Sequence, residues 1–383
     1  MIYFDNSSTT RQADEVTKVI ERTAREAFGN PSSLHRLGLE SEKIVTEARK
    51  RFAASIGASP EEVYFNSGGS EGDNEVILGT ARTRRKTHRK MVSTAVEHPA
   101  VLEPLKRLQE DGWEVVLIGV DRWGRPDMEA LRAAVDEDTA LVSMMAVNNE
   151  TGAVMPVREA AAIAHRKGAY FHTDAVQAYG KMDLSGLDAD FLTVSGHKFH
   201  GPKGTGAIYI RKGIHLPPLI LGGGQERGFR SGTENVPDIA GFGEACRLAA
   251  EAGQEASDRM ARVRATLLQG LRAEVPDIQV NSPEDGAPSV LNVSFLGTRG
   301  EVILHSLETS GLYVSTGSAC SSHKRGGSHV LTAMGLSDQA LEGAIRFSFS
   351  RYNTPEEAEK AVDLVKEAVG TFRRLGQFRR GRR

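Results

Sequence analysis

Two residues that could carry covalent cofactor chemistry follow β-rich stretches in the middle of the chain. Asp174 closes the run AYFHTDAVQ, and Lys198, 24 residues later, closes FLTVSGHK. We expect both where a strand ends and the chain turns, which is where open α/β sheets bind ligands. A lysine there can form a Schiff base with an aldehyde cofactor, and an aspartate across the crevice can keep a pyridine nitrogen protonated. The pair predicts a pyridoxal 5'-phosphate (PLP) site; the alternative is a surface lysine and a helix-capping aspartate.

A glycine turn upstream of this pair could bind a phosphate. The sequence EEVYFNSGGSEGDNEVILG is typical of a strand, a turn at 67–70 and then a helix. Backbone N–H groups and the positive end of the helix dipole make such a turn an anion site. It matches neither the P-loop nor the GxGxxG pattern. Beside a candidate Schiff-base lysine, a phosphate cradle is the favoured interpretation.

The elements that would position these residues alternate along the chain. Helical stretches such as 101–112 and 157–168 lie between several of seven β-rich runs, which indicates crossover connections and a mainly parallel sheet. The runs are 61–67, 90–96, 113–120, 139–147, 169–175, 190–196 and 205–211. The later part of the chain is typical of a smaller α+β unit. We therefore expect a large α/β domain over 12–250 and a small domain formed by 1–11 and 251–383.

The composition is that of an ordinary globular protein. The 383 residues are 39% hydrophobic and 26% charged, with a formal net charge of −2. This charge argues against nucleic-acid binding through bulk electrostatics, and no apolar run approaches the roughly 20 residues of a membrane span. The two cysteines, Cys246 and Cys320, have a spacing that matches no metal or redox pair. With no signal peptide visible in MIYFDNSSTT, we expect a cytoplasmic protein without a metal site.

Several further motifs occur in a fixed order along the chain. They include DNSSTT (5–10), GNPSSLH (29–35), SGGSEGDN (67–74), EHPAVL (97–102), NNETG (148–152), HTDAVQ (172–177), SGHKFHGPKGTG (195–206), GGGQERGFRSGTENVP (222–237), STGSAC (315–320) and AIRFS (344–348). With them the sequence resembles the cysteine desulfurases over essentially its whole length; SGHK, RSGTENVP and GSAC are together highly specific. The resemblance implies a PLP-dependent transferase of fold type I, with a mainly parallel seven-stranded sheet, that works as a homodimer.

The resemblance also implies which residues hold the cofactor. Lys198 would bond to PLP, His98 would stack on the ring and could move protons, Asp174 would face the pyridine nitrogen, and Gln177 would face the phenolic oxygen. The phosphate would be held by Gly69, Ser70, Ser195 and His197. Thr233 would reach the phosphate bound in the neighbouring subunit.

The substrate and the sulfur acceptor follow from the same resemblance. Asn149, also a cofactor contact, and Arg346 would bind L-cysteine near its carboxylate, which suits the bidentate guanidinium. Cys320 would take the substrate sulfur; it lies in STGSACSSHKRGGSHV, whose small and polar residues predict an exposed, flexible loop of the longer type in this family. Basic neighbours favour its thiolate. Cys246, within GEACRLAAEA, is expected to be a packing residue.

These expectations combine into a PLP-dependent cysteine desulfurase that forms L-alanine and a persulfide on Cys320. The sulfur would pass to an acceptor protein, either an iron–sulfur scaffold or a sulfur carrier for tRNA thiolation. Two alternatives remain open from the sequence: a selenocysteine lyase or other PLP lyase, and a PLP-fold scaffold or regulatory protein. The basic runs 81–90 and 373–383 are interpreted as solvated ends rather than nucleic-acid sites.

Overall fold

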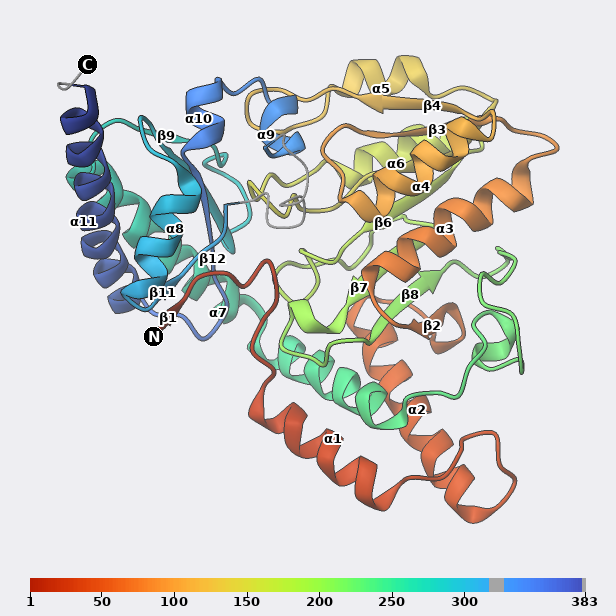
Figure 1. The fold of residues 1–383 in the computed structure, drawn as a ribbon. Helices are drawn as coiled ribbons and strands as arrows, with labels where there is room; N and C mark the ends of the chain where they lie inside the picture. The colour runs from red at the N-terminus through yellow and green to blue at the C-terminus, as the bar shows by residue number, and fades with distance from the viewer. Residues whose placement is uncertain (317–326, 381–383) are drawn as a thin grey trace.

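The large part of the chain is built around one seven-stranded sheet. The computed structural model describes residues 1–316 and 327–380 (Figure 1). The strands are β2 (Val63–Asn66), β3 (Lys90–Thr94), β4 (Glu114–Ile118), β5 (Thr139–Ser143), β6 (Tyr170–Asp174), β7 (Phe191–Ser195) and β8 (Gly206–Ile210). Their order is β2-β8-β7-β6-β5-β3-β4, and only β8 runs antiparallel to its neighbours. Each strand lies within a predicted run, so the expectation of a mainly parallel sheet is confirmed.

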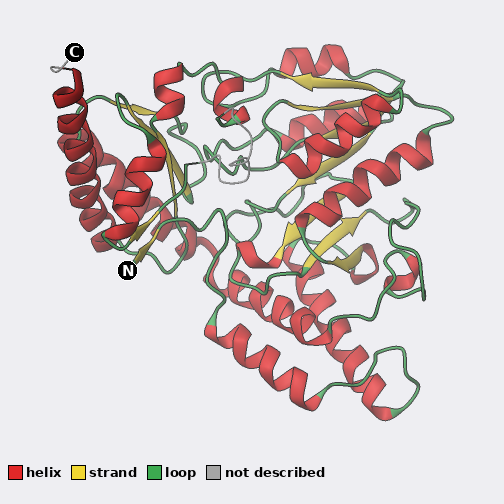
Figure 2. Ribbon diagram, viewed as in Figure 1, coloured by secondary structure: helices red, strands yellow, loops and turns green. Residues whose placement is uncertain are grey.

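Helices enclose this sheet, as Figure 2 shows. They are α2 (Arg36–Ser55), α3 (Gly69–Arg84), α4 (Pro99–Glu110), α5 (Met128–Ala134), α6 (Val157–Arg166) and the start of α7 (Val236–Glu274). α1 (Asp14–Glu26) packs on α7 rather than on the sheet. β3, β5 and β7 are buried along their whole length. Strands covered on both faces need apolar side chains in both directions. This explains why the sequence shows apolar runs rather than an alternating pattern.

The alternation of side chains along β6 and β7 decides which polar residues face the same helix. On β7, Phe191 packs with Val76 and Ile77 of α3, whereas Leu192 and Val194 belong to the core on the opposite face of the sheet. Since side chains at i and i+2 share a face, Thr193 and Ser195 also point towards α3. By the same rule, His172 and Asp174 of β6 lie on this face. These polar side chains of β6 and β7 therefore lie on the face of the sheet that α3 covers.

The remaining described residues form a smaller unit that contains the N-terminal strand and the last helix (Figure 1). Its strands are β1 (Ile2–Tyr3), paired with β11 (Leu312–Tyr313), and the antiparallel set β12 (Ala344–Ser348), β10 (Val290–Phe295) and β9 (Ile278–Val280). Its helices are α8 (Gly300–Thr309), α9 (His329–Ala333), α10 (Asp338–Glu342) and α11 (Pro355–Arg380). Among the described residues, no helix combines the length and the apolarity that crossing a membrane requires.

The two units meet along α7, whose helical backbone is broken at Gly253, where φ is 45°. This break lies beside the predicted boundary between residues 250 and 251. Val330 and Leu331 of α9 pack into the core of the large unit, although they follow that boundary in sequence. The domain boundaries stay a prediction.

Candidate active site

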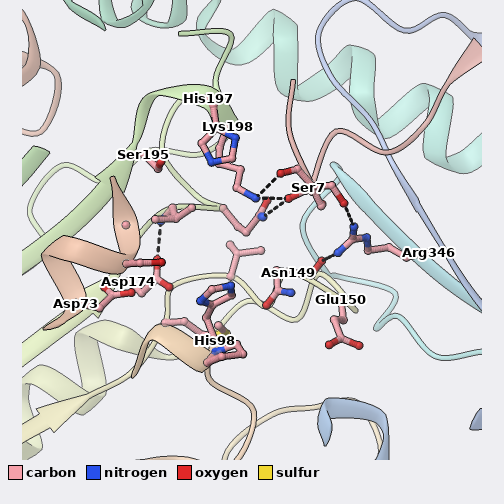
Figure 3. A pocket seen from close by; sticks show the side chains of 18 of the residues that line it. Ser7, Asp73, His98, Asn149, Glu150, Asp174, Ser195, His197, Lys198 and Arg346 are labelled. Atoms are coloured by element: carbon pink, nitrogen blue, oxygen red, sulfur yellow. Dashed lines mark hydrogen bonds between the residues drawn. The ribbon is translucent and has the colours of Figure 1, made fainter. Parts of the chain in front are cut away.

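A cavity of about 330 Å³ lies at the carboxyl ends of β6 and β7. Asp174 ends β6, and a short 3-10 turn, Gly196–Lys198, carries Lys198 away from the end of β7 (Figure 3). Asp174 is paired in register with Thr193, so the two strands that present the reactive residues are direct neighbours. The small unit closes the cavity with Arg346 of β12, and the N-terminal segment adds Ser7 and Ser8.

Ten of the predicted site residues line this one cavity: Gly69, Ser70, His98, Asn149, Asp174, Gln177, Ser195, His197, Lys198 and Arg346. They come from six separate motifs, which only the fold brings together. Three buried polar atoms of cavity residues, Ser7 Oγ, Asp73 Oδ1 and Arg346 Nε, have no hydrogen-bond partner among the described residues. Buried polar atoms are rarely left unpaired. Their presence fits a cavity that is shaped for a polar ligand.

The glycine turn before α3 has the close packing of a phosphate cradle. Gly68 has a φ of 146°, which L side chains rarely adopt, and a Cβ on Gly69 would lie 2.8 Å from Val176 Cγ2. The backbone therefore reaches the cavity wall where the N-terminus of α3 favours an anion. A further cavity of about 330 Å³ behind the turn is lined by Ser195, His197 and Lys203 as well. This donor set fits a phosphate, and Lys203 is a member that the sequence did not predict.

Asp174 lies in an environment that disfavours its charge. Burial raises the pKa of Asp174 to about 6, while the Val176 N–H, 2.9 Å from its Oδ1, and the Lys198 ammonium oppose the rise. A cation placed against this carboxyl would therefore be strongly favoured, because it supplies the missing counter-charge. The protonated pyridine nitrogen of PLP fits this requirement.

Asp73 and His172 lie behind Asp174 and were missed by the sequence reasoning. Burial raises the pKa of Asp73 well above its usual value, and the nearby Asp174 carboxylate adds to the effect. His172 is held by Ser143 Oγ at 2.8 Å and Thr193 Oγ1 at 3.1 Å, and burial lowers its pKa to about 3. A protonated Asp73 and a neutral His172 leave the negative charge to Asp174. The only sequence signal for this arrangement is the two-residue period of β6, which puts His172 on the same face as Asp174.

His98 is held as a neutral imidazole with a defined tautomer. Its Nδ1 accepts the Ala100 N–H at 3.1 Å as the N-cap of α4, which leaves the ring proton on Nε2. Burial, together with Lys198 and His329, lowers its pKa to about 4. The preceding Glu97, not predicted from the sequence, anchors this turn because its buried carboxyl accepts the Met145 N–H and the Thr94 hydroxyl. His98 can thus donate a hydrogen bond through Nε2 at neutral pH.

The amine of Lys198 is held by the N-terminal segment. Nζ donates to the carbonyl oxygens of Ser7 at 2.5 Å and Ser8 at 2.9 Å. The same Ser7 carbonyl accepts the amide N–H of Gln177 at 3.0 Å. The motif DNSSTT therefore contributes to the site through its backbone carbonyl groups. Its side-chain types alone do not predict this role.

The opposite end of the cavity carries a buried guanidinium. Arg346 donates to Asp5 Oδ1 at 2.9 Å, to Ser8 Oγ at 2.7 Å and to the backbone carbonyl of Asn149 at 3.1 Å. These contacts fix the plane of the group, with its side chain 5% exposed. A pre-oriented guanidinium of this kind is suited to a carboxylate. Arg346 is therefore placed where the carboxylate of an amino acid could be bound.

Two predicted residues lie outside this arrangement. Thr233 lines a separate cavity of about 220 Å³ beside Ser67 and Arg230, and Arg230 is paired with Glu71 at 2.7 Å within the same chain. Cys320 lies outside the described residues. Cys246 is buried in the core, as expected of a packing residue, and burial raises the pKa of its thiol to about 12.

The sequence and the structure match one group of known proteins throughout. The family described as aminotransferase class-V matches residues 2–361. A cysteine desulfurase IscS of Methanosarcina thermophila is 41% identical over 98% of this chain and 93% of its own length. A cysteine desulfurase of Trichormus azollae is 42% identical over 99% of this chain and 95% of its own. A solved NifS-like protein superposes with a TM-score of 0.91 at 40% identity, covering 97% of this chain and 99% of the other.

The chain therefore belongs to the class-V aminotransferase family, whose enzymes use PLP on a fold of type I. The cradle, the lysine and the aspartate of the cavity are the parts that such a cofactor requires. Within this family the chain belongs with the cysteine desulfurases, since relatives of that name match nearly its full length.

Proposed function

We propose that this chain removes sulfur from L-cysteine, releases L-alanine and leaves a persulfide on Cys320. The observation that carries this proposal is one cavity in which Lys198 lies between Asp174 and Arg346 (Figure 3). In such a cavity the cofactor would bind on the Asp174 side of the Lys198 amine, and the substrate carboxylate on the Arg346 side. The names of the matched relatives support cysteine as the substrate.

The residues present fit PLP. Lys198 would hold its aldehyde carbon, Asp174 its pyridine nitrogen, Gln177 its phenolic oxygen and His98 a face of its ring. The phosphate would be held by Gly69, Ser70, Ser195 and His197. Burial and Lys198 lower the pKa of His197 to about 4, and its Nδ1 bonds Thr9 Oγ1 at 3.0 Å, so it would bind the phosphate as a neutral imidazole. When bound, the cofactor supplies an electron sink that stabilises negative charge at the substrate Cα.

The chain's own groups would move the protons. Lys198 Nζ would be the base that removes and returns the proton on the substrate Cα. His98 Nε2–H would donate a hydrogen bond to negative charge that develops on the bound substrate. The Cβ–S bond of the substrate breaks as the S–S bond to Cys320 forms. The electron pair stays on Cβ, which gains one proton, while the Cys320 thiol loses one; the products are alanine and Cys320–S–SH.

The activity is tested by supplying L-cysteine and a thiol reductant to the PLP-loaded protein. We expect alanine and sulfide in equal amounts. Pyruvate and ammonia in place of alanine would indicate a lyase that eliminates at Cβ, and turnover restricted to selenocysteine would indicate a selenocysteine lyase. No turnover of either amino acid would favour a scaffold.

Replacing Arg346 with alanine is expected to weaken the use of L-cysteine at low concentration. The lost charged hydrogen bonds cost roughly 1.5–3 kcal/mol, which corresponds to about a 10–150-fold rise in KM. Arg346→Lys keeps the positive charge but loses the planar guanidinium, so its KM should lie between those of the wild type and Arg346→Ala. Arg264→Ala is the control, because this half-buried arginine donates to the backbone carbonyls of residues 283, 284 and 290, which lie away from the cavity. An Arg346→Ala enzyme with wild-type KM would place the carboxylate elsewhere.

We also propose that the active form is a homodimer whose sites are completed by the partner. Two segments at the edge of the large unit expose apolar side chains, namely Phe28 and Leu34 between α1 and α2, and Leu221 before the glycine-rich loop 222–235 (Figure 1). Phe28 is 71% and Leu34 fully exposed. Large exposed apolar side chains are typical of an interface. The polar loop that follows Leu221 would bring Thr233 to the partner's phosphate.

Mixing two inactive chains tests this arrangement. Lys198→Ala removes the amine from one chain, and Thr233→Asp puts a negative charge where the phosphate would be approached in the other. The mixed dimer should regain one intact site, and therefore up to about half of the wild-type activity per dimer. Arg230 is left unchanged because it holds Glu71 in its own chain. If mixed dimers form and remain inactive, Thr233 serves its own subunit.

The proposed partners are a second copy of the chain and a sulfur-acceptor protein, either an iron–sulfur scaffold or a sulfur carrier. We place the protein in the cytoplasm, because a persulfide and the free thiol of Cys246 are chemically consistent with a reducing environment.

A further inference from the structure

A second lysine lies buried behind the active site without a carboxylate to neutralise it. Lys181, shortly after β6, is 9% exposed. Of the residues that the structure describes, none forms an ion pair with it, whereas the equally buried Lys90 is paired with Asp136 and Glu114. Burying an unpaired ammonium is costly, so lysine is retained at such a position only rarely. Stability therefore does not explain why a lysine occupies position 181.

Among the described residues, the side chain of Lys181 has one hydrogen-bond partner, and this partner leads to the cofactor site. Lys181 Nζ donates to Gln177 Oε1 at 3.0 Å. On the other side of the same carboxamide, Gln177 Nε2 donates to the Ser7 carbonyl at 3.0 Å, and this carbonyl also accepts Lys198 Nζ at 2.5 Å. A continuous chain of contacts thus joins the two lysines through one amide group and one carbonyl.

These partners allow only one orientation of the Gln177 amide. A lysine ammonium has donors alone, and a backbone carbonyl accepts alone. A flipped amide would set its NH₂ against the ammonium and its oxygen against the carbonyl. Lys181 and Ser7 together therefore keep Oε1 turned away from Lys198 and Nε2 turned towards the cavity.

The cavity that Lys181 lines on its outer side carries Arg125 and Asp285, which form an ion pair with each other. The groups whose charges act on Lys181, or on which it acts, are all basic. They are Lys198, Arg346, His197 and His200. Burial, then Lys198 and Arg346, lowers the pKa of Lys181 to about 7. Even a neutral amine keeps two N–H donors, so the bond to Gln177 persists on both sides of this titration.

We propose that Lys181 is a positioning residue that fixes Gln177 as a hydrogen-bond donor to the phenolic oxygen of PLP. This inference rests on the role proposed above for Gln177. A donor at that oxygen stabilises the negative charge that remains there once the nitrogen of Lys198 has lost its proton. The donor therefore lowers the pH at which the Lys198-bound cofactor loses this proton, and Lys181 acts on that pH through Gln177.

The test is a pH titration of the visible absorption of the cofactor-loaded protein. Lys181→Met keeps the length of the side chain and removes the donor, and it should raise the titration midpoint by about one pH unit. Gln177→Leu should give the same rise. The double variant should show no further rise, because the two residues act on the cofactor through one contact. Lys181→Arg, which keeps the donor, should return the midpoint close to that of the wild type.

Lys90→Met is the matched control, since it removes a lysine of equal burial that lies away from the cavity. It should lower Tm and leave the midpoint unchanged. A wild-type midpoint in Lys181→Met, or a double variant whose rise equals the sum of the two single ones, would overturn the proposal. If Lys181→Met does not fold, a wild-type midpoint in Gln177→Leu is equally decisive. Peptide mapping that places the cofactor away from Lys198 would instead refute the proposed site itself.

Discussion

Lys198→Ala is expected to abolish turnover and to leave the cofactor without a covalent attachment. The variant loses both the amine that holds PLP and the base positioned at the substrate Cα, so the rate should fall on the order of 10⁴-fold or more. The carbonyl oxygens of Ser7 and Ser8, which accept this amine, would also lose their donor. PLP could still bind through the cradle, but more weakly.

Borohydride reduction followed by peptide mapping locates the attachment directly. In the wild type the label should be found on Lys198, and in Lys198→Ala no lysine should carry it. Lys212→Ala serves as the control, because Lys212 is exposed beyond β8 and should leave both label and rate unchanged. Label on Lys203 or Lys212 of the wild type would mean that the wrong lysine has been assigned.

Cys320→Ser is expected to retain PLP and lose desulfuration. Serine cannot hold a persulfide, while every residue proposed to hold the cofactor lies elsewhere in the chain. The absorption of the bound cofactor should therefore match that of the wild type, with alanine formation reduced by at least about 10²-fold. Activity at the wild-type rate would show that another group accepts the sulfur.

Cys246→Ser is the matched control for this experiment. The thiol of Cys246 is 1% exposed and lies beside Tyr179 in the core of the large unit. A buried hydroxyl in place of a thiol should lower the free energy of unfolding by about 1–3 kcal/mol and leave turnover nearly intact. A loss of activity in both variants would make the assignment of Cys320 untenable.

The sequence predicted the sheet because local patterns determine it. All seven strands lie within apolar runs, and the residues at their carboxyl ends, Asp174 and Ser195, reached the site by topology alone. The runs overestimated some strand lengths. The run 139–147 continues beyond β5, which ends at Ser143. Met144 and Ala146 still donate to the β6 carbonyls of His172 and Asp174, but on the other side the Met145 N–H bonds the buried Glu97 rather than a strand. Such a contact, 48 residues apart, leaves no local signal.

The part of the site that sequence reasoning missed lies one contact behind the residues it found. Lys181, Asp73, His172 and Glu97 touch the predicted residues only in the folded chain, and each looks ordinary in its local sequence. The break in α7 is a further example, since it depends on a positive φ at Gly253 that a helical pattern does not predict. The sequence motifs predict the residues that contact the ligand. The residues that orient them are determined by tertiary packing, which local sequence does not show.

The central claim is that one turnover moves one sulfur atom from L-cysteine to Cys320. A single-turnover reaction without reductant, followed by mass spectrometry of the Cys320 peptide, tests it most directly. We expect the peptide to gain the mass of one sulfur atom, in an amount equal to the alanine released, and a reductant to remove it. Alanine released with no added sulfur on Cys320, or added sulfur on Cys246 instead, would contradict the account.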